Sequence, residues 1–406
     1  MNNWCFSYSI FFDKLSNNYK IMGINRIILN ETSYFGAGSR SVLASEVKKR
    51  GFKKVFVVTD NDLVKFGVAA QVTSVLEAAG IPFQIFSDVK QNPTVKQVKA
   101  GGAEFAASGA DVIVAIGGGS PIDTAKAIGI IAANPEFADV VSLEGIADTK
   151  NKSIPVIALP TTAGTAAEVT INYVITDEEN VKKMVCVDPN DIAILSIVDA
   201  ELMVSMPRGL TAATGMDALT HAVEGYITKG AWEMSDMFEL KAIEMIAKHL
   251  PAVVENPSDV VARDGMATAQ YIAGMGFSNV GLGLVHGMAH PLGAYFDIPH
   301  GVANALLLPI VMQYNMASAI DKYSDIAKAM GVNIDGLSKE AAAQAAVDAV
   351  KALAVKVGIP ERLRDLKVTD DSLGKLAQSA FNDVCTPGNP REVTLEEVLE
   401  LYKIAY

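Results

Sequence analysis

The sequence contains little cysteine, histidine or tryptophan, and the shortage of cysteine is the most restrictive. Its 406 residues include three cysteines, five histidines and two tryptophans. Cys5, Cys186 and Cys385 lie far apart and form no CxxC pair, which argues against a disulfide framework and against a zinc knuckle. We therefore expect the protein to fold and act in a reducing, cytoplasmic compartment.

Positive charge and long apolar runs are also scarce. The formal net charge is −12, so the protein would repel the phosphates of nucleic acids and anionic lipid surfaces. No run in the sequence approaches the roughly 18 uninterrupted apolar residues that a membrane-spanning helix needs. We expect neither nucleic acid nor a membrane as a partner, and a small molecule as the substrate.

The first 21 residues differ in composition from the rest of the chain. They are rich in aromatic residues, lack a basic segment and contain Asp13 before any small-residue cleavage site, so a signal peptide is not expected. We interpret residues 1–21 as an N-terminal extension. It is either a segment that precedes a native start at Met22 or a short native addition.

Strand and helix patterns alternate through the first half of the chain. Short apolar runs rich in valine and isoleucine predict strands at residues 54–59, 83–86, 112–116 and 156–159. Nearly continuous apolar runs suit strands that are covered on both faces, as in a parallel sheet. A polar turn at 177–180 predicts a hairpin between residues 172–176 and 183–187. This order of elements is typical of α/β architecture.

After Asp199 the strand pattern fades, and helical segments rich in alanine, methionine and leucine continue to the end of the chain. A chain of this length, half of it hydrophobic, favours two domains over one. We predict an α/β domain over residues 22–204 and an all-α domain over residues 205–406.

A glycine-rich turn follows the strand predicted at 112–116. Residues 117–120 read Gly-Gly-Gly-Ser and lead into a helix, where glycines allow close backbone approach and free N–H groups attract an anion. The turn could cradle a pyrophosphate together with the hydroxyl-rich residues 160–165, which follow the next strand. It is not a GxGxxG motif, so an ordinary strand-to-helix turn remains the alternative.

Asp60 ends the first clear strand. A carboxylate at that position can accept hydrogen bonds from a ribose diol and would repel a 2′-phosphate, which favours NAD over NADP. The alternative is that Asp60 only caps a helix beginning at Asn61 or Asp62.

The histidines cluster in the second half of the chain. His286, His290 and His300 fall within fifteen residues, and His221 follows Asp217 by four residues, which places both on one face of a helix. The spacing by itself favours His286 and His290 as joint metal ligands. One carboxylate with imidazoles suits Fe(II), Zn, Co, Ni or Mn. The five candidates exceed what a tetrahedral site with an open position needs, so at least one serves beside the metal.

A nicotinamide site combined with a Lewis acid indicates alcohol and aldehyde redox chemistry. A non-redox metalloenzyme, such as a lyase or hydrolase, is the alternative from another class, and a metal-binding module without catalysis is a third. His249, on a separate helical segment, is interpreted as an ordinary core residue.

Three motifs resemble those of the iron-dependent (group III) alcohol dehydrogenases, and the resemblance runs from Asn25 to Tyr406. They lie at residues 117–123 (GGGSPID), 160–170 (PTTAGTAAEVT) and 283–293 (GLVHGMAHPLG). The resemblance implies a Rossmann-like NAD-binding domain, an all-α metal-binding domain, a site in the cleft between them, and a homodimer. It also implies iron-dependent reduction of a small aldehyde, with L-lactaldehyde expected and a broader primary alcohol, butanol or 1,3-propanediol dehydrogenase as the alternative.

The resemblance also assigns roles to particular residues. It implies that the metal ligands are Asp217, His221, His286 and His300, with His290 beside the metal for catalysis or proton relay. The implied cofactor contacts are Asp60, Asn92, Gly118, Gly119, Ser120, Asp123, Thr161, Thr162, Thr165 and Lys183. The implied substrate contacts are Asn172, Phe277 and Cys385. From residue type alone, Phe277 and Cys385 would more often be core residues and Lys183 a solvated hairpin charge.

Overall fold

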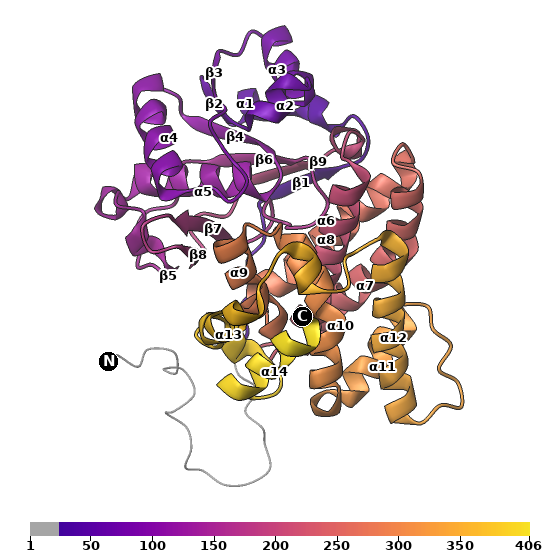
Figure 1. Cartoon of the computed structure of the whole chain (residues 1–406). Coiled ribbons are helices and arrows are strands. Elements are labelled where there is room, and N and C mark those ends of the chain that lie inside the picture. The colour runs from indigo at the N-terminus through magenta and orange to yellow at the C-terminus, as the bar shows by residue number, and fades with distance from the viewer. Residues whose placement is uncertain (1–23) are drawn as a thin grey trace.

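The computed structural model describes residues 24–406, which form a half built on a parallel sheet and a half built of helices (Figure 1). The predicted extension at residues 1–21 lies outside the described residues. The main sheet has six strands in the order β1-β9-β6-β4-β2-β3, and every pairing in it is parallel. Its strands are β1 (Thr32–Phe35), β2 (Val55–Val58), β3 (Phe83–Phe86), β4 (Val112–Gly117), β6 (Val156–Pro160) and β9 (Leu195–Val198).

The four strands predicted for this sheet are confirmed to within one residue at each end. Every residue of β2 and β4 is buried, because helices cover both faces of the sheet. Side chains alternate along β2, so Phe56 and Val58 pack with α4 (Val95–Ser108) and α5 (Gly119–Ala133). Val55 and Val57 pack on the opposite face with α1 (Leu43–Lys49) and α3 (Val68–Ala78). A shorter helix, α2 (Asn61–Lys65), follows β2 directly.

A second, three-stranded sheet has the order β5-β8-β7. The predicted hairpin is confirmed as the antiparallel pair β7 (Asn172–Asp177) and β8 (Lys182–Val187), and β5 (Gly145–Ile146) pairs with β8. The N–H of Thr176 in β7 donates to the carbonyl of Pro93, at 2.7 Å, which joins the hairpin to the loop after β3.

Residues 205–406, all of which the structure describes, contain helices and no strand, so the predicted all-α half is confirmed. Its centre is α6, in which almost every residue after Thr211 is buried. The helices of this half are α6 (Arg208–Ile227), α7 (Glu233–Glu255), α8 (Val260–Val280), α9 (Leu284–Phe296), α10 (His300–Asn315), α11 (Ile320–Ala329), α12 (Lys339–Val357), α13 (Leu373–Phe381) and α14 (Leu395–Ala405).

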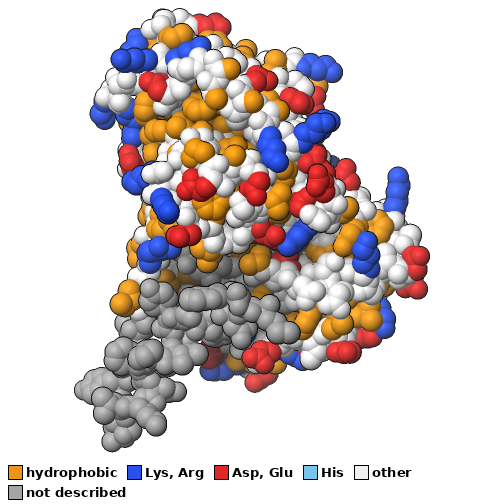
Figure 2. All heavy atoms as spheres, turned by 90° about the vertical axis from the view of Figure 1, so that its left-hand side faces the viewer, with side chains coloured by type: hydrophobic (Ala, Val, Ile, Leu, Met, Phe, Trp, Pro, Cys, Tyr) orange, Lys and Arg blue, Asp and Glu red, His pale blue; other side chains and the backbone are white. Residues whose placement is uncertain are grey.

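The charge on the surface and the length of the helices are relevant to the expectation that neither nucleic acid nor a membrane is a partner. On the face drawn in Figure 2, basic and acidic side chains are interspersed, and the basic ones do not gather into a stripe. Among the described residues, the helices include none whose length and apolar character would carry it across a membrane.

Candidate active site

Four side chains that the sequence predicts as metal ligands come together from three helices. Asp217 and His221 lie one turn apart on α6, His286 lies in the first turn of α9, and His300 is the first residue of α10. One potential ligand atom from each residue lies within 4.8 Å of those of the other three. Asp217, His221 and His286 are buried, whereas the side chain of His300 keeps 27% of its surface exposed.

The environment keeps these imidazoles neutral near pH 7. Burial lowers the pKa of His221 to about 4 and that of His286 to about 3. Burial and the neighbouring imidazoles hold the pKa of His300 well below its usual value. Neutral imidazole is the form that offers a lone pair to a metal ion. One carboxylate and three neutral imidazoles therefore form a donor set that fits a divalent transition metal.

Glu224, which the sequence analysis did not single out, fixes the orientation of His286. Its carboxylate accepts a hydrogen bond from Nδ1 of His286 at 2.6 Å and from the backbone N–H of Val285 at 2.6 Å. With the proton held on Nδ1, the lone pair on Nε2 is free to bind a metal. Asp217, His221 and Glu224 are spaced i, i+4, i+7 on α6, so helical periodicity could have found Glu224.

His290 lies beside the four-residue group and has a different partner. Its Nδ1 is 2.8 Å from Oδ2 of Asp383, and Oδ1 of Asp383 accepts from the N–H of Cys385 at 2.9 Å. Burial by itself would raise the pKa of Asp383, but His290 and the N–H of Cys385 outweigh it and hold the pKa below its usual value. Although spacing favoured His286 and His290 as a pair, the structure places His290 with Asp383 and Cys385 instead.

Five of the predicted cofactor residues follow the carboxyl ends of β4 and β6, namely Gly118, Gly119, Thr161, Thr162 and Thr165. A Cβ added to Gly118 would lie 3.1 Å from the side chain of Thr162, and one added to Gly119 would lie 3.0 Å from that of Thr165. The two loops thus pack so closely that a side chain at either glycine would require the facing threonine to shift. Thr161 is the residue directly after β6, and its N–H donates to the carbonyl of Gly117 at 2.9 Å.

Ser120 and Asp123 lie in the first turns of α5. Asp123 accepts the N–H of Val174 at 3.0 Å through Oδ2, whereas its Oδ1 is buried and has no hydrogen-bond partner among residues 24–406. Burial raises the pKa of this carboxyl to about 7. Lys126, also on α5, donates to the carbonyl of Asn172 at 2.9 Å. Helix α5 therefore holds the start of β7 beside the glycine-rich turn.

Asp60 has a structural role that the sequence left open. Its side chain accepts the N–H of Leu63 at 2.8 Å, so Asp60 caps α2. Asp60 is the second residue after the end of β2, and β2 pairs with β4, the strand that precedes the glycine-rich turn. The ribose contact predicted for Asp60 is compatible with the cap, because the capping bond uses one carboxylate oxygen.

Asn92 and Lys183 form a bridge between the two halves of the molecule. Nζ of Lys183 donates to Oδ1 of Asn92 at 2.8 Å, and Nδ2 of Asn92 donates to Oδ1 of Asp297 at 2.9 Å. Burial lowers the pKa of Lys183 to about 8, so Lys183 is not the solvated charge that its residue type suggested. Asp297 follows α9 and precedes His300 by three residues, so the bridge ends beside the histidine cluster.

Two of the three predicted substrate residues adjoin the histidines. The ring of Phe277 stacks on that of His221, with centroids 4.2 Å apart, although Phe277 also belongs to the hydrophobic core of the helical half. Cys385 lies beside Asp383 and His290. Asn172 begins β7 and is positioned from its backbone by Lys126.

His249, interpreted as a core residue, lies on α7 outside both side-chain groups and is half-buried against Gly265.

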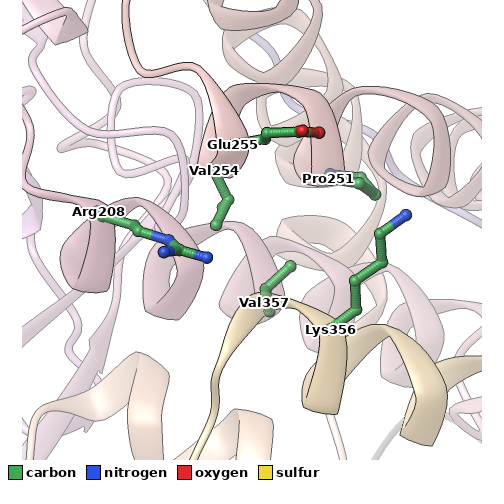
Figure 3. Close-up of a pocket in the computed structure, with 6 residues that line it drawn as sticks. All are labelled: Arg208, Pro251, Val254, Glu255, Lys356 and Val357. Atoms are coloured by element: carbon green, nitrogen blue, oxygen red, sulfur yellow. The ribbon is translucent and has the colours of Figure 1, made fainter.

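A surface cavity of about 300 Å³ lies between the start of α6 and the ends of α7 and α12 (Figure 3). It is lined by Arg208, Pro251, Val254, Glu255, Lys356 and Val357. None of these residues belongs to the predicted sites.

The chain belongs to the iron-containing alcohol dehydrogenase family. Residues 30–200 match the family model described as iron-containing alcohol dehydrogenase, and residues 211–406 match the C-terminal model of the Fe-containing alcohol dehydrogenase family. These matches confirm the resemblance drawn from the three motifs.

Individual relatives cover nearly the whole chain. It is 58% identical to lactaldehyde reductase of Escherichia coli K12, over 94% of this chain and all of that protein. It is 39% identical to NAD-dependent methanol dehydrogenase of Bacillus methanolicus, over 92% of this chain and 97% of that protein. The crystal structure of a 1,3-propanediol oxidoreductase, 42% identical, superposes with a TM-score of 0.92 and covers 94% of this chain and 100% of its own. The Rossmann-like and all-α arrangement is thereby confirmed.

Replacing Glu224 tests its influence on His286. We expect Glu224→Gln to weaken metal binding by about 10-fold or more, because the neutral amide holds the Nδ1 proton less firmly. The measurement is the dissociation constant of Co(II), by competition with a chelator. The exposed Glu77→Gln on α3 is the control and should bind as the unaltered protein does. Equal affinity in all three proteins would contradict the role of Glu224.

Proposed function

We propose that this protein is an NAD-dependent, iron-dependent lactaldehyde reductase. It reduces L-lactaldehyde to L-1,2-propanediol with NADH and catalyses the reverse oxidation. The observation that carries the proposal is the 58% identity to a lactaldehyde reductase over 94% of the chain. The cluster of Asp217 and three histidines supports it, because its donor set suits the metal of the family.

The metal site is proposed on Asp217, His221, His286 and His300. Iron bound there supplies Lewis-acid polarisation of the substrate oxygen. Phe277, whose ring stacks on that of His221, is proposed to contact the substrate on one side. Cys385 and Asn172 are proposed to contact the substrate on its other sides.

The cofactor site is proposed at the carboxyl edge of the main sheet. The N–H groups at the start of α5, with Gly118, Gly119 and Ser120, would hold the pyrophosphate, because free donors at a helix N-terminus attract an anion. The carboxylate of Asp60 would accept hydrogen bonds from the ribose hydroxyls. The remaining contacts are proposed for Asn92, Asp123, Thr161, Thr162, Thr165 and Lys183, which lie around the same edge or bridge it to the histidine cluster.

Proton transfer is proposed for His290. Asp383 engages Nδ1 of this imidazole at 2.8 Å, which leaves Nε2 as the nitrogen that can give a proton to the substrate oxygen or take one from it. His290 also stacks on the proposed ligand His300, with ring centroids 5.5 Å apart. The proton donor is therefore adjacent to the site where the substrate oxygen would be polarised.

A second candidate keeps the fold and changes the substrate. The 42% identity to 1,3-propanediol oxidoreductase favours oxidation of that diol, and a broader primary alcohol or butanol dehydrogenase is related to it.

We further propose that the protein acts in the cytoplasm as a homodimer, in the metabolism of fucose or rhamnose, on a small-molecule substrate. The domains are proposed as 22–204, binding NAD, and 205–406, binding the metal, after an extension at 1–21. The last strand ends at Val198 and α6 begins at Arg208, which supports a boundary between them.

Activity measurements on the iron-loaded protein test the whole reaction. Protein purified without oxygen and loaded with iron should oxidise NADH with a higher kcat/KM for L-lactaldehyde than for butanal or 3-hydroxypropanal. Asp217→Ala and His300→Ala should lose both iron, by elemental analysis, and turnover, because each removes a ligand. An active, iron-free variant would contradict the proposed site, and a preference for 3-hydroxypropanal would support the second candidate.

Replacing Asp60 tests its role in the choice between NADH and NADPH. Asp60→Asn keeps an oxygen that can cap α2 but removes the charge that repels a 2′-phosphate. We expect the NADPH to NADH ratio of kcat/KM to rise about 10-fold, and Asp60→Gly to give a similar rise with some loss of stability. If neither variant changes the ratio, Asp60 is a cap and nothing more.

Replacing Asp383 tests whether it orients His290 for proton transfer. Asp383→Asn should lower kcat about 10²-fold, because the imidazole of His290 loses the carboxylate that orients it for proton transfer. KM and iron content should change little, which separates a positioning role from a role in holding the metal. Asp371→Asn serves as control, because Asp371 is exposed and precedes α13. Loss of iron in parallel with activity would contradict the proton-transfer role.

A further inference from the structure

Asn304 places an amide group among the proposed metal ligands. It lies on α10, one turn after His300, and its side chain is fully buried. Nδ2 of Asn304 is 2.7 Å from Oδ1 of Asp217, 3.1 Å from Nε2 of His286 and 3.1 Å from Nε2 of His300. A single nitrogen therefore contacts three of the four proposed ligand residues.

The direction of these hydrogen bonds follows from the neighbouring groups. The carboxylate of Asp217 accepts, and Nε2 of His286 accepts because Glu224 holds the proton on Nδ1. The amide nitrogen, with two hydrogens, is thus the atom that must face the cluster. Oδ1 of Asn304 is buried and finds no hydrogen-bond partner in the described part of the chain, which is an unfavourable arrangement for a residue that only fills space.

The amide nitrogen of Asn304 thus donates toward Oδ1 of Asp217 and Nε2 of His286, whose lone pairs a metal ion would use. Converging acceptors without an ion repel one another, and two N–H hydrogens among them offset that repulsion. Once imidazole lone pairs engage a metal, they no longer accept from Asn304. The bond to Oδ1 of Asp217 is the one that can persist.

We propose that Asn304 is a positioning residue for the metal site: it holds Asp217, His286 and His300 in ligand geometry before metal binds, and afterwards keeps the carboxylate of Asp217 oriented. The inference rests on the proposed function, because it requires that the four residues bind a metal. It adds a residue that neither touches the substrate nor serves as a ligand but sets the affinity of the site.

Replacement by leucine separates positioning from packing, since leucine has a similar size and no polar atoms. A residue that only filled space would tolerate the change, because leucine removes an unpaired buried oxygen. A positioning residue would not, because the ligand atoms would lose their common donor. We therefore expect Asn304→Leu to raise the dissociation constant for Co(II) by about 10- to 100-fold and to shift the visible absorption spectrum of the bound Co(II).

Asn315→Leu is the matched control, because Asn315 is also buried on α10 but exchanges hydrogen bonds with Asn389, at 2.7 and 2.8 Å, instead of with the ligands. It should lower the thermal midpoint of the metal-free protein without changing Co(II) affinity or spectrum. Unchanged Co(II) affinity and spectrum in Asn304→Leu would overturn the proposal.

Asn304→Asp provides a second variant of nearly identical shape. It removes the donor and puts a carboxylate next to that of Asp217, so the metal-free protein should melt at a lower temperature and Co(II) should raise the midpoint more than in the unaltered protein. An equal rise in both proteins would count against the proposal. If the unaltered protein and the Asp217→Ala variant bind Co(II) with equal affinity, the proposed metal site is wrong, and the inference about Asn304 is wrong with it.

Discussion

The contact between Glu224 and the first turn of α9 is the interaction on which the site depends. A buried carboxylate must be hydrogen-bonded, and this one finds its partners in two backbone N–H groups and one imidazole at the start of another helix. The same contact docks α9 on α6 and sets the tautomer of His286. One carboxylate therefore links two helices that carry proposed ligands and orients one of those ligands.

The sequence was sufficient for the parts of the fold with strong local patterns. Apolar runs predicted β2, β4 and β6, in which every residue is buried, and a shorter apolar run predicted β3 despite Gln84. It did not predict β1 or β9, in which Ser33 and Ser196 interrupt the apolar residues. The hydroxyl of Ser196 donates to the carbonyl of Glu168, which is distant in sequence. The partner that allows this serine to be buried in a strand therefore cannot be recognised from the local sequence.

For the site, the scarcity of histidine made the cluster visible, but spacing alone paired His286 with His290. A turn of helix separates those residues, yet the partners of each come from other helices, Glu224 on α6 for one and Asp383 after α13 for the other. The choice among the histidines came from family resemblance. Asn304 and Asp383 were missed because their roles depend on contacts 87 and 93 residues away along the chain.

The bridge from Lys183 through Asn92 to Asp297 has a consequence for how such a chain can change over time. Asn92 and Asp297 both adopt left-handed backbone conformations, with φ of 58° and 52°, which few side chains tolerate. One belongs to the sheet half and the other to the helical half. A recombination that replaced either half with that of a distant relative would have to bring a residue that tolerates the same backbone conformation and forms the same hydrogen bond.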